Sequence, residues 1–362
     1  MIMKIKLISH QELNMRPSIL AISTAIALAA VPVSFAQAKN TTLESTKTTS
    51  EITIDGQIDA VWNDIKAAKI KLGKLPYKPN NGYEGMKKTT VEIKSLYDKE
   101  FVYFLISYND PTKSIDRFPW VKQDDNSWKQ MVNKDSTGHD NTYYEDKFAV
   151  FWNINADGFA EKGCNAACHR SKDGKIAGRD DKNPARKFTK EGQYIDMWHW
   201  KGVRTGAHDQ LDDQYVDSNT DPKANKGWGR KGDDKTGGGY VNNIKDGQPA
   251  FVTPELTADT LLIHEAEKQP FTADFNASDR IPGLTGAPFT GSRGDIDVGA
   301  VWKDGVWTLE MKRKLVTTGS NAETQDVQFN DMNKAYPFGV AVFDNSQINH
   351  IFHRGVMNLE FK

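Results

Sequence analysis

The chain has 362 residues, with 47 basic and 48 acidic side chains and a formal net charge of −1. This balance leaves no basic excess for binding nucleic acid or an anionic membrane surface. Hydrophobic residues make up 38% of the chain, and 17 Phe, 11 Tyr and 9 Trp supply large side chains for a core. The composition therefore indicates a soluble globular protein.

Residues 1–38 have the pattern of a secretory signal peptide. A positively charged start precedes an apolar run at 19–33, and cleavage is expected after Ala36 or Ala38. The run is shorter than the roughly 20 apolar residues of a transmembrane helix. We expect a mature chain of residues 39–362 that is exported to the periplasm without stable membrane insertion.

Short runs of alternating, β-branched or aromatic residues predict strands along the mature chain. The runs at 90–97 and 101–108 are separated by three turn residues and form a predicted hairpin. Further strands are expected at 52–54, 147–153, 194–201, 296–302, 306–315, 339–343 and 348–352. Long amphipathic helices are scarce, so a single all-β domain, an antiparallel immunoglobulin-like β-sandwich, is predicted. Two long insertions are expected at about 159–191 and about 202–247.

The only two cysteines lie in the first insertion, in Cys164-Asn165-Ala166-Ala167-Cys168-His169. Two thiols on a short turn and a following histidine are what covalent haem attachment needs, although the usual spacing is C-x-x-C-H. We predict one covalent haem c on Cys164 and Cys168, with His169 as the proximal iron ligand. A Cys164–Cys168 disulfide and a zinc site remain alternatives, although structural zinc normally takes four protein ligands.

Several segments resemble a known family. Ile54-Asp55-Gly56, Asp59, Trp62 and Asp110-Pro111-Thr112 are similar to CBM9-like and DOMON-type β-sandwiches. The similarity sharpens toward the ethylbenzene dehydrogenase-related haem-binding family in the segments 144–152, 163–169, 196–201, 307–318 and 336–345. This resemblance implies a DOMON-like sandwich with a haem pocket. In the dehydrogenase-subunit branch the haem is b-type and non-covalent, so the cysteine pair would make this chain a c-type variant.

The resemblance also implies a second axial ligand from a late strand. By position, His350 is the first choice for the distal iron ligand, and strand alternation places His353 on the opposite face. The remaining candidates are His199, Met357 and Met197. A filled sixth position favours electron transfer over catalysis.

Other side chains near the motif admit two interpretations each. The aromatic residues either pack on the macrocycle or fill the sandwich core; they are Trp152, Trp198, Trp200 and Phe338. The basic residues either pair with propionates, guide an acidic partner or form solvated surface; they are Lys162, Arg170, Lys172, Lys175 and Arg179. Acidic pairs such as Asp212-Asp213 and Asp233-Asp234 leave calcium open.

The sequence contains no P-loop, nucleophile elbow or H-E-x-x-H motif. We therefore expect a non-enzymatic periplasmic monohaem c-type cytochrome that exchanges electrons with a redox partner, a respiratory oxidoreductase or another cytochrome. The alternative is an extracytoplasmic carbohydrate- or ligand-binding module with a Cys164–Cys168 disulfide. A haem sensor or catalyst with an open sixth position is a third reading.

Overall fold

The computed structural model describes residues 41–362 except 74, 76, 170–174, 177, 181–182 and 184–185. The predicted signal peptide, Arg170 and Lys172 lie outside the described residues. Within them, no helix has both the length and the apolar character to cross a membrane.

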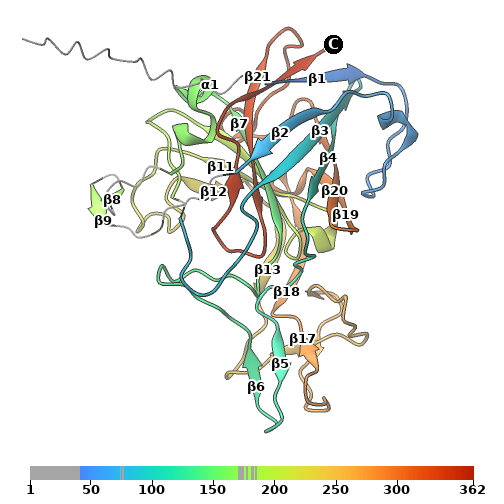
Figure 1. The fold of residues 1–362 in the computed structure, drawn as a ribbon, viewed down its shortest axis with the longest axis vertical. Helices are drawn as coiled ribbons and strands as arrows, with labels where there is room; N and C mark the ends of the chain where they lie inside the picture. The colour runs from blue at the N-terminus through green and yellow to red at the C-terminus, as the bar shows by residue number, and fades with distance from the viewer. Residues whose placement is uncertain are drawn as a thin grey trace, which may run out of the picture. The chain divides into compact units, whose positions relative to one another are not determined.

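Thirteen strands form one sheet that curls until its two halves face each other (Figure 1). In hydrogen-bonding order the path is β12 (Arg230–Gly232), β11 (Asp212–Val216), β10 (Ile195–Lys201), β7 (Lys147–Asn153), β21 (Tyr336–Phe343), β23 (Met357–Phe361), β1 (Thr41–Lys47), β3 (Thr89–Tyr97), β4 (Phe101–Asn109), β20 (Val306–Lys314) and β19 (Asp297–Lys303). Two further strands, β2 (Ala68–Leu72) and β22 (Ile351–Phe352), pair with β3 and β21. All pairs are antiparallel except those of β1, which runs parallel to both neighbours.

The core lies between the two halves of this sheet. Alternate residues of β7, including Phe148 and Trp152, point inward and meet rings from β4. The rings of Phe104 and Trp152 lie 5.8 Å apart, and those of Tyr108 and Phe148 lie 5.9 Å apart. Because burial of apolar surface is the main favourable term in folding, this interleaved cluster holds the two halves together.

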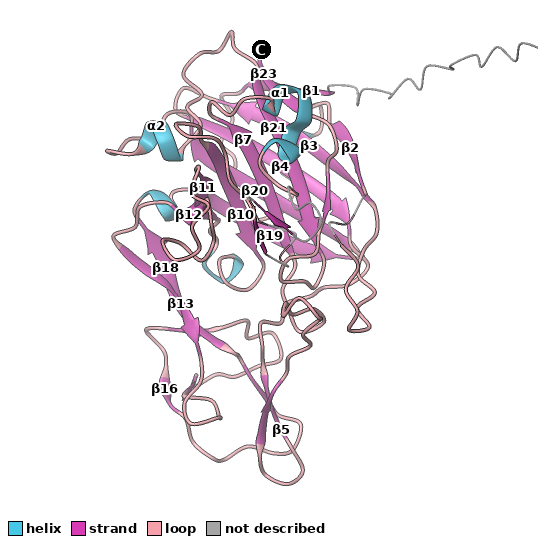
Figure 2. Cartoon of the chain, turned by 90° about the vertical axis from the view of Figure 1, so that its left-hand side faces the viewer, coloured by secondary structure: helices cyan, strands magenta, loops and turns pink. Residues whose placement is uncertain are grey.

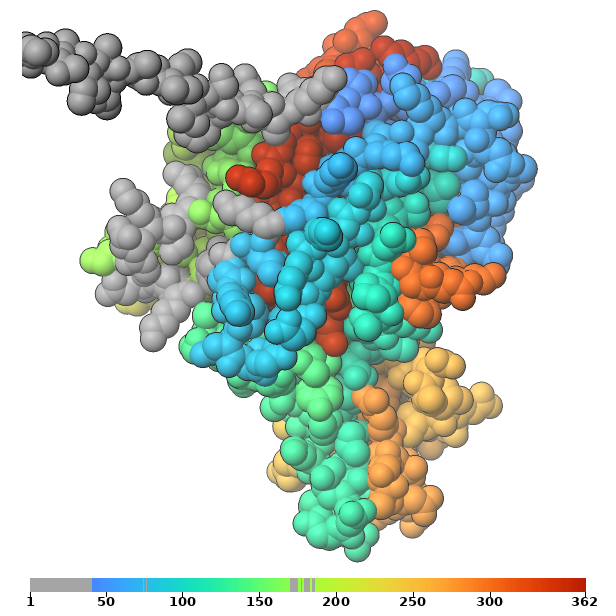
Figure 3. Space-filling view, viewed as in Figure 1, coloured from blue at the N-terminus to red at the C-terminus, as the bar shows by residue number. Residues whose placement is uncertain are grey.

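Smaller sheets complete the described chain. One sheet contains β5 (Trp120–Lys122), β6 (Trp128–Gln130) and β17 (Arg280–Ile281), and another contains β13 (Gly237–Asn242), β18 (Leu284–Thr290) and β15 (Ile263–His264). Two further sheets have two strands each: β14 (Phe251–Val252) with β16 (Gln269–Pro270), and β8 (Lys175–Ile176) with β9 (Arg179–Asp180). Figure 2 shows β13 and β18 between the large sheet and a lobe that contains β5 and β16. In the space-filling view this lobe projects from the sandwich (Figure 3). The helices are short: α1 (Phe159–Lys162) and α2 (Ala322–Gln325).

The β-sandwich prediction is confirmed, and most of the predicted strands are present. Three differences stand out. Residues 52–54 form no strand, whereas the polar segment Thr41–Lys47 forms β1. The predicted loop at 202–247 contains β11, β12 and β13. Polar sequences form strands here because a neighbouring strand supplies backbone hydrogen bonds, which local hydrophobic periodicity does not record.

Candidate functional site

The outward face of β7, β10 and β21 is largely buried, although an antiparallel sheet often leaves one face to solvent. Strand pairing aligns its residues in three rows. The first row is Gly339, Phe151 and Met197, the second is Ala341, Ala149 and His199, and the third is Phe343, Lys147 and Lys201. Over about 13 Å of strand, the side chains thus change from apolar in the first row, to small ones with His199 in the second, to two lysines with Phe343 in the third.

The insertion that follows β7 covers the first row. α1 and a 3₁₀ turn at Gly163–Ala166 bring both cysteines into a buried cluster with Phe151 and Phe159. The close approach requires glycine at 339, because a Cβ atom there would lie 2.7 Å from the Sγ of Cys164. The two thiols therefore lie directly against the outward face of the sheet.

Both thiols are buried and free, so the disulfide alternative is not formed in this structure. The N–H of Cys168 donates to the carbonyl oxygen of Cys164 at 2.9 Å, which closes a single turn. Burial raises the pKa of both thiols, that of Cys168 to about 11, so they are protonated at neutral pH. A buried neutral thiol is a poor zinc ligand, and no metal-ligating cluster in the described chain includes a cysteine.

His169 and His350 line the same pocket as the thiols. Their ring centroids lie 5.2 Å apart, and His169 stacks on Phe352 at 4.4 Å. The Nδ1 of His350 donates to the carbonyl oxygen of Ile348 at 2.7 Å. Because a carbonyl oxygen only accepts, Nδ1 carries the proton and Nε2 keeps the lone pair that a metal needs. Burial, with smaller effects from nearby groups, lowers the pKa of His350 well below its usual range and keeps the ring neutral.

The other predicted axial ligands are distributed differently. Met197 lines the thiol pocket, whereas His199 lines a neighbouring cavity. Met357 pairs with Phe338 and belongs to the sandwich core on the other side of the sheet. His353 is buried but is not among the side chains that line the thiol pocket.

The aromatic residues proposed for the macrocycle also face away from the pocket. All four belong to the sandwich core, namely Trp152, Trp198, Trp200 and Phe338. Of the two interpretations of these residues, packing in the sandwich core is the one that the structure supports, because alternation along β7, β10 and β21 directs them away from the pocket.

A cavity of about 320 Å³ adjoins the thiol pocket and has a cationic wall. Eight of its lining side chains are basic and none is a carboxylate. Lys187, Met197 and Phe343 line both spaces. The pocket therefore has an apolar end at the cysteines and opens at its other end onto positive charge.

Lys147, at this cationic end, has no carboxylate partner among the described residues. Its Nζ donates to the carbonyl oxygen of Gln347 at 2.8 Å and lies 4.1 Å from the ring centroid of Phe343. Burial, reinforced by the nearby Arg204, lowers the pKa of Lys147. Because a buried ammonium without a counter-ion is costly, this end of the pocket suits an anionic group.

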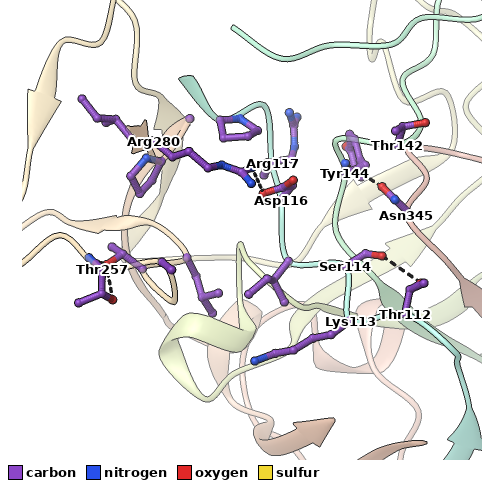
Figure 4. Close-up of a pocket in the computed structure, with 18 residues that line it drawn as sticks. Thr112, Lys113, Ser114, Asp116, Arg117, Thr142, Tyr144, Thr257, Arg280 and Asn345 are labelled. Carbon is purple, nitrogen blue, oxygen red and sulfur yellow. Dashed lines mark hydrogen bonds and ion pairs between the residues drawn. The ribbon is translucent and has the colours of Figure 1, made fainter. Parts of the chain in front are cut away.

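A larger cavity, of about 410 Å³, lies where the sandwich meets the lobe (Figure 4). Asp116 and Arg280 form an ion pair of 2.6 Å at its edge, and the N–H of Tyr144 donates to Asn345 Oδ1 at 3.0 Å. The residues that line it include no cysteine or histidine. This cavity therefore has none of the thiol and imidazole ligands of the pocket under the insertion.

The sequence-based reasoning missed the floor of the pocket and its cationic end. The floor consists of small residues, Ala149, Gly339 and Ala341, and Lys147 extends the same face. A signal was present, because small or charged residues alternate with large apolar ones in β7 and β21. Such alternation, on a sheet covered on both faces, indicates a face where small side chains form the floor of a pocket.

Fold and site together define a β-sandwich protein with a pocket of two thiols and two imidazoles under an inserted segment. The chain belongs to the ethylbenzene dehydrogenase family, whose family model matches residues 59–355. The family resemblance read from the sequence is thus confirmed.

Other similarities are weaker. The chain is 29% identical over 104 residues to endo-1,4-beta-xylanase A of Thermotoga maritima, a match that takes 27% of this chain and 8% of that protein. Two solved structures of a family 9 carbohydrate binding module from Caldicellulosiruptor kristjanssonii, in complex with cellotriose and with glucose, are 10% and 11% identical. Both alignments cover 89% of this chain, and 94% and 96% of the modules, with a TM-score of 0.31.

Proposed function

We propose that this protein is a periplasmic monohaem c-type cytochrome that carries electrons to or from a respiratory oxidoreductase. The observation that supports the proposal is the convergence of Cys164, Cys168, His169 and His350 in one buried pocket. A partner enzyme or a second cytochrome would exchange the electrons, and the chain itself would contribute no catalytic residue.

The change from apolar to cationic side chains along the outward sheet face suits the two edges of haem. Haem has vinyl groups on one side and propionates on the opposite side. The cysteines lie over the apolar row, where thioether bonds would form, and the small side chains of Ala149 and Ala341 would let a flat ring lie against the sheet once the insertion moves outward. Lys147 would pair with a propionate, because charge-assisted hydrogen bonds are the stronger ones, whereas Lys201 already pairs with the buried Asp212.

The donor set suits iron as well. His169 and His350 are the imidazoles that would hold it, and the bond from His350 Nδ1 to Ile348 fixes that ring. When bound, haem supplies one-electron transfer. With both imidazoles bound, the iron would have no site left for an external ligand, which would favour electron transfer over oxygen chemistry.

Haem attachment requires the pocket to open. Its volume is about 30 Å³, room for about one water molecule, and the rings of His169 and Phe352 are stacked within it. The segment Phe159–His169 would therefore move outward when haem binds. Loops that open in this way belong to the less stable parts of a fold.

The test is to express the full chain with c-haem maturation machinery and to extract it with acidic acetone. We expect the haem to stay with the protein, because thioether bonds survive this treatment. Cys168→Ala should lower the covalently retained haem severely. The same chain expressed without the maturation machinery is the control for adventitious haem binding.

If all colour passes into the acetone from the wild type, the covalent assignment is wrong and a b-type haem takes its place. A colourless protein would favour the second candidate, a carbohydrate-binding module, for which the similarity to part of a xylanase is the supporting observation. Calorimetric titration with glucose and cellotriose would then decide that alternative.

A further inference from the structure

A second group of buried ionisable side chains lies on the other face of β10, within the sandwich. Asp196, Asp213 and Asp326 each offer an oxygen within 4.8 Å of the others, and Asp233 lies beside them. All four are buried, with exposed fractions of 0%, 0%, 1% and 3% in the order given. They stand apart from the thiol pocket, because the sheet separates the two.

The fold brings these residues together from distant parts of the chain. Asp213 pairs with Trp198 across β10 and β11, so both side chains point into the core. The N–H of Asp233 donates to the carbonyl oxygen of Asp213 at 3.1 Å, and the N–H of Val327 donates to Asp196 Oδ2 at 2.9 Å. These bonds connect β10, β11 and the segment after α2 around the carboxylates.

The charge of the group is poorly balanced. Arg313 on β20 is the cation that pairs with it in the described chain, at 3.1 Å from Asp326 Oδ1 and 3.8 Å from Asp196 Oδ2. Four carboxylates and one guanidinium leave a formal charge of −3 when all are ionised. Repulsion of this size in a buried region calls for protonation or for another cation.

Oxygen atoms without partners point to a cation. Among the described residues, Asp196 Oδ1 and Asp213 Oδ2 accept no hydrogen bond. Asp233, which is not one of the three clustered residues, has no donor to either oxygen although it is only 3% exposed. Buried polar atoms are nearly always satisfied in native proteins, so four such oxygens in one place require an explanation.

We propose that Asp196, Asp213 and Asp326 bind one divalent cation beside the carboxylate of Asp233, which is unpartnered among the described residues, and that the cation is calcium. The donors are all hard oxygen atoms, which calcium takes in sets of six to eight and in flexible geometry. Magnesium is less suitable because it keeps several waters, and these carboxylates are buried. The ion would fix β10 to the segment after α2, and so hold in place the strand whose outward face carries Met197 and His199.

The test uses full-length protein freed of metal with EDTA and titrated calorimetrically with CaCl₂. Terbium luminescence gives a second readout, because the Nε1 of Trp198 donates to Asp196 Oδ2 at 3.0 Å and its indole can sensitise a bound lanthanide. Asp213→Asn should weaken calcium binding at this site by about tenfold or more and lower the Trp-sensitised emission. Asp124→Asn, a matched change on an exposed residue, should leave both unchanged.

A second buried trio, Asp110, Asp146 and Asp344, requires its own control. Asp110→Asn should leave calcium binding at Asp196, Asp213 and Asp326 unaltered. A wild type that binds no calcium overturns the proposal. The proposal is also overturned if Asp110→Asn abolishes calcium binding and both Asp233→Asn and Asp213→Asn leave it unchanged. Circular dichroism of each variant checks that a loss of binding is not a loss of fold.

Discussion

The backbone at His169 has a φ of +55°, in the left-handed region that residues other than glycine seldom adopt. The additional residue of the C-x-x-x-C-H spacing completes a turn between the cysteines, with a hydrogen bond from Cys168 to Cys164. The unusual φ follows directly after that turn, where the ring of His169 faces His350 and Phe352. Strained backbone of this kind collects at functional sites.

His350→Ala is expected to open one coordination site on the iron of the proposed haem. The spectrum should shift from low spin to high spin, and carbon monoxide should bind to the reduced protein. His353→Ala is the matched control, because that ring does not line the thiol pocket. Absorption spectra with and without carbon monoxide are the measurement. A low-spin spectrum in His350→Ala would exclude it as the ligand and direct the same assay to Met197 and His199.

At the scale of elements, β21 determines how closely the insertion can approach the sheet. Gly339 lies under Cys164, and Ala341 is next to it on the same face. The strand is therefore both part of the sandwich and the floor of the pocket. Its inward residues fix its position, and its outward residues keep the pocket shallow and flat.

Gly339→Ala should displace Cys164 and lower the yield of covalent haem. The added Cβ would meet Sγ at 2.7 Å, and overpacking of this kind costs about 1–3 kcal/mol. Gly73→Ala is the control, because its Cβ meets no atom within 4 Å. Haem content per protein and the thermal midpoint measure the effect. Equal haem content in the two variants would show that Cys164 does not need this contact.

The cationic end of β7 should tune the reduction potential. Lys147→Met removes a buried positive charge beside the proposed propionates. The loss of this charge stabilises the oxidised state of the proposed haem, which is the more positively charged one. The potential should fall by something on the order of 50 mV, while Lys147→Arg should largely retain it. Redox titration checks this, and an unchanged potential in Lys147→Met would place the propionates elsewhere.

At the scale of the whole molecule, a group of buried carboxylates lies on the core side of β10, where Arg313 is the cation that pairs with it among the described residues. Burial, with smaller effects from neighbouring carboxylates, raises the pKa of Asp196 to about 8 and that of Asp233 to about 9, although Arg313 opposes the shift for both. These groups bind protons more tightly in the folded chain than in the unfolded one. The stabilising effect of protonation is then complete below pH about 4, near the pKa of an unfolded aspartate. It is lost as the pH rises through the folded-state pKa values of Asp196 and Asp233.

In metal-free protein, Asp196 and Asp233 should therefore contribute a loss of stability between pH about 4 and pH about 9. Each acid that is protonated only in the folded state contributes roughly 1.4 kcal/mol per pH unit. Urea unfolding at pH 5 and pH 8 in EDTA measures the loss, and Asp233→Asn should reduce it. Added calcium should flatten the profile by replacing protons. Because buried histidines such as His350 act in the opposite direction, the readout is the difference between wild type and Asp233→Asn, and identical pH profiles in the two would contradict the raised pKa of Asp233.

The sequence by itself determined the strands with strong alternation, the family and the C-x-x-x-C-H motif. The segment 147–153 is a strand with the predicted bounds, because successive side chains alternate between the two faces of the sheet and those on the inward face are all apolar. The two cysteines and His169 needed no fold to be found, because all three lie on one short stretch of chain. Such signals are local, and local patterns survive in a linear sequence.

Only the tertiary structure decided what these elements face. It placed His350 opposite His169 although the two are far apart in the chain, and it assigned Trp152 and Trp198 to the core. It also gathered Asp196 and Asp326 into one buried group. Pairing register and the curl of the sheet set these contacts, and neither leaves a periodic trace in the sequence. The polar strand β1 was missed for the same reason, since its partners β23 and β3, rather than its own side chains, make it a strand.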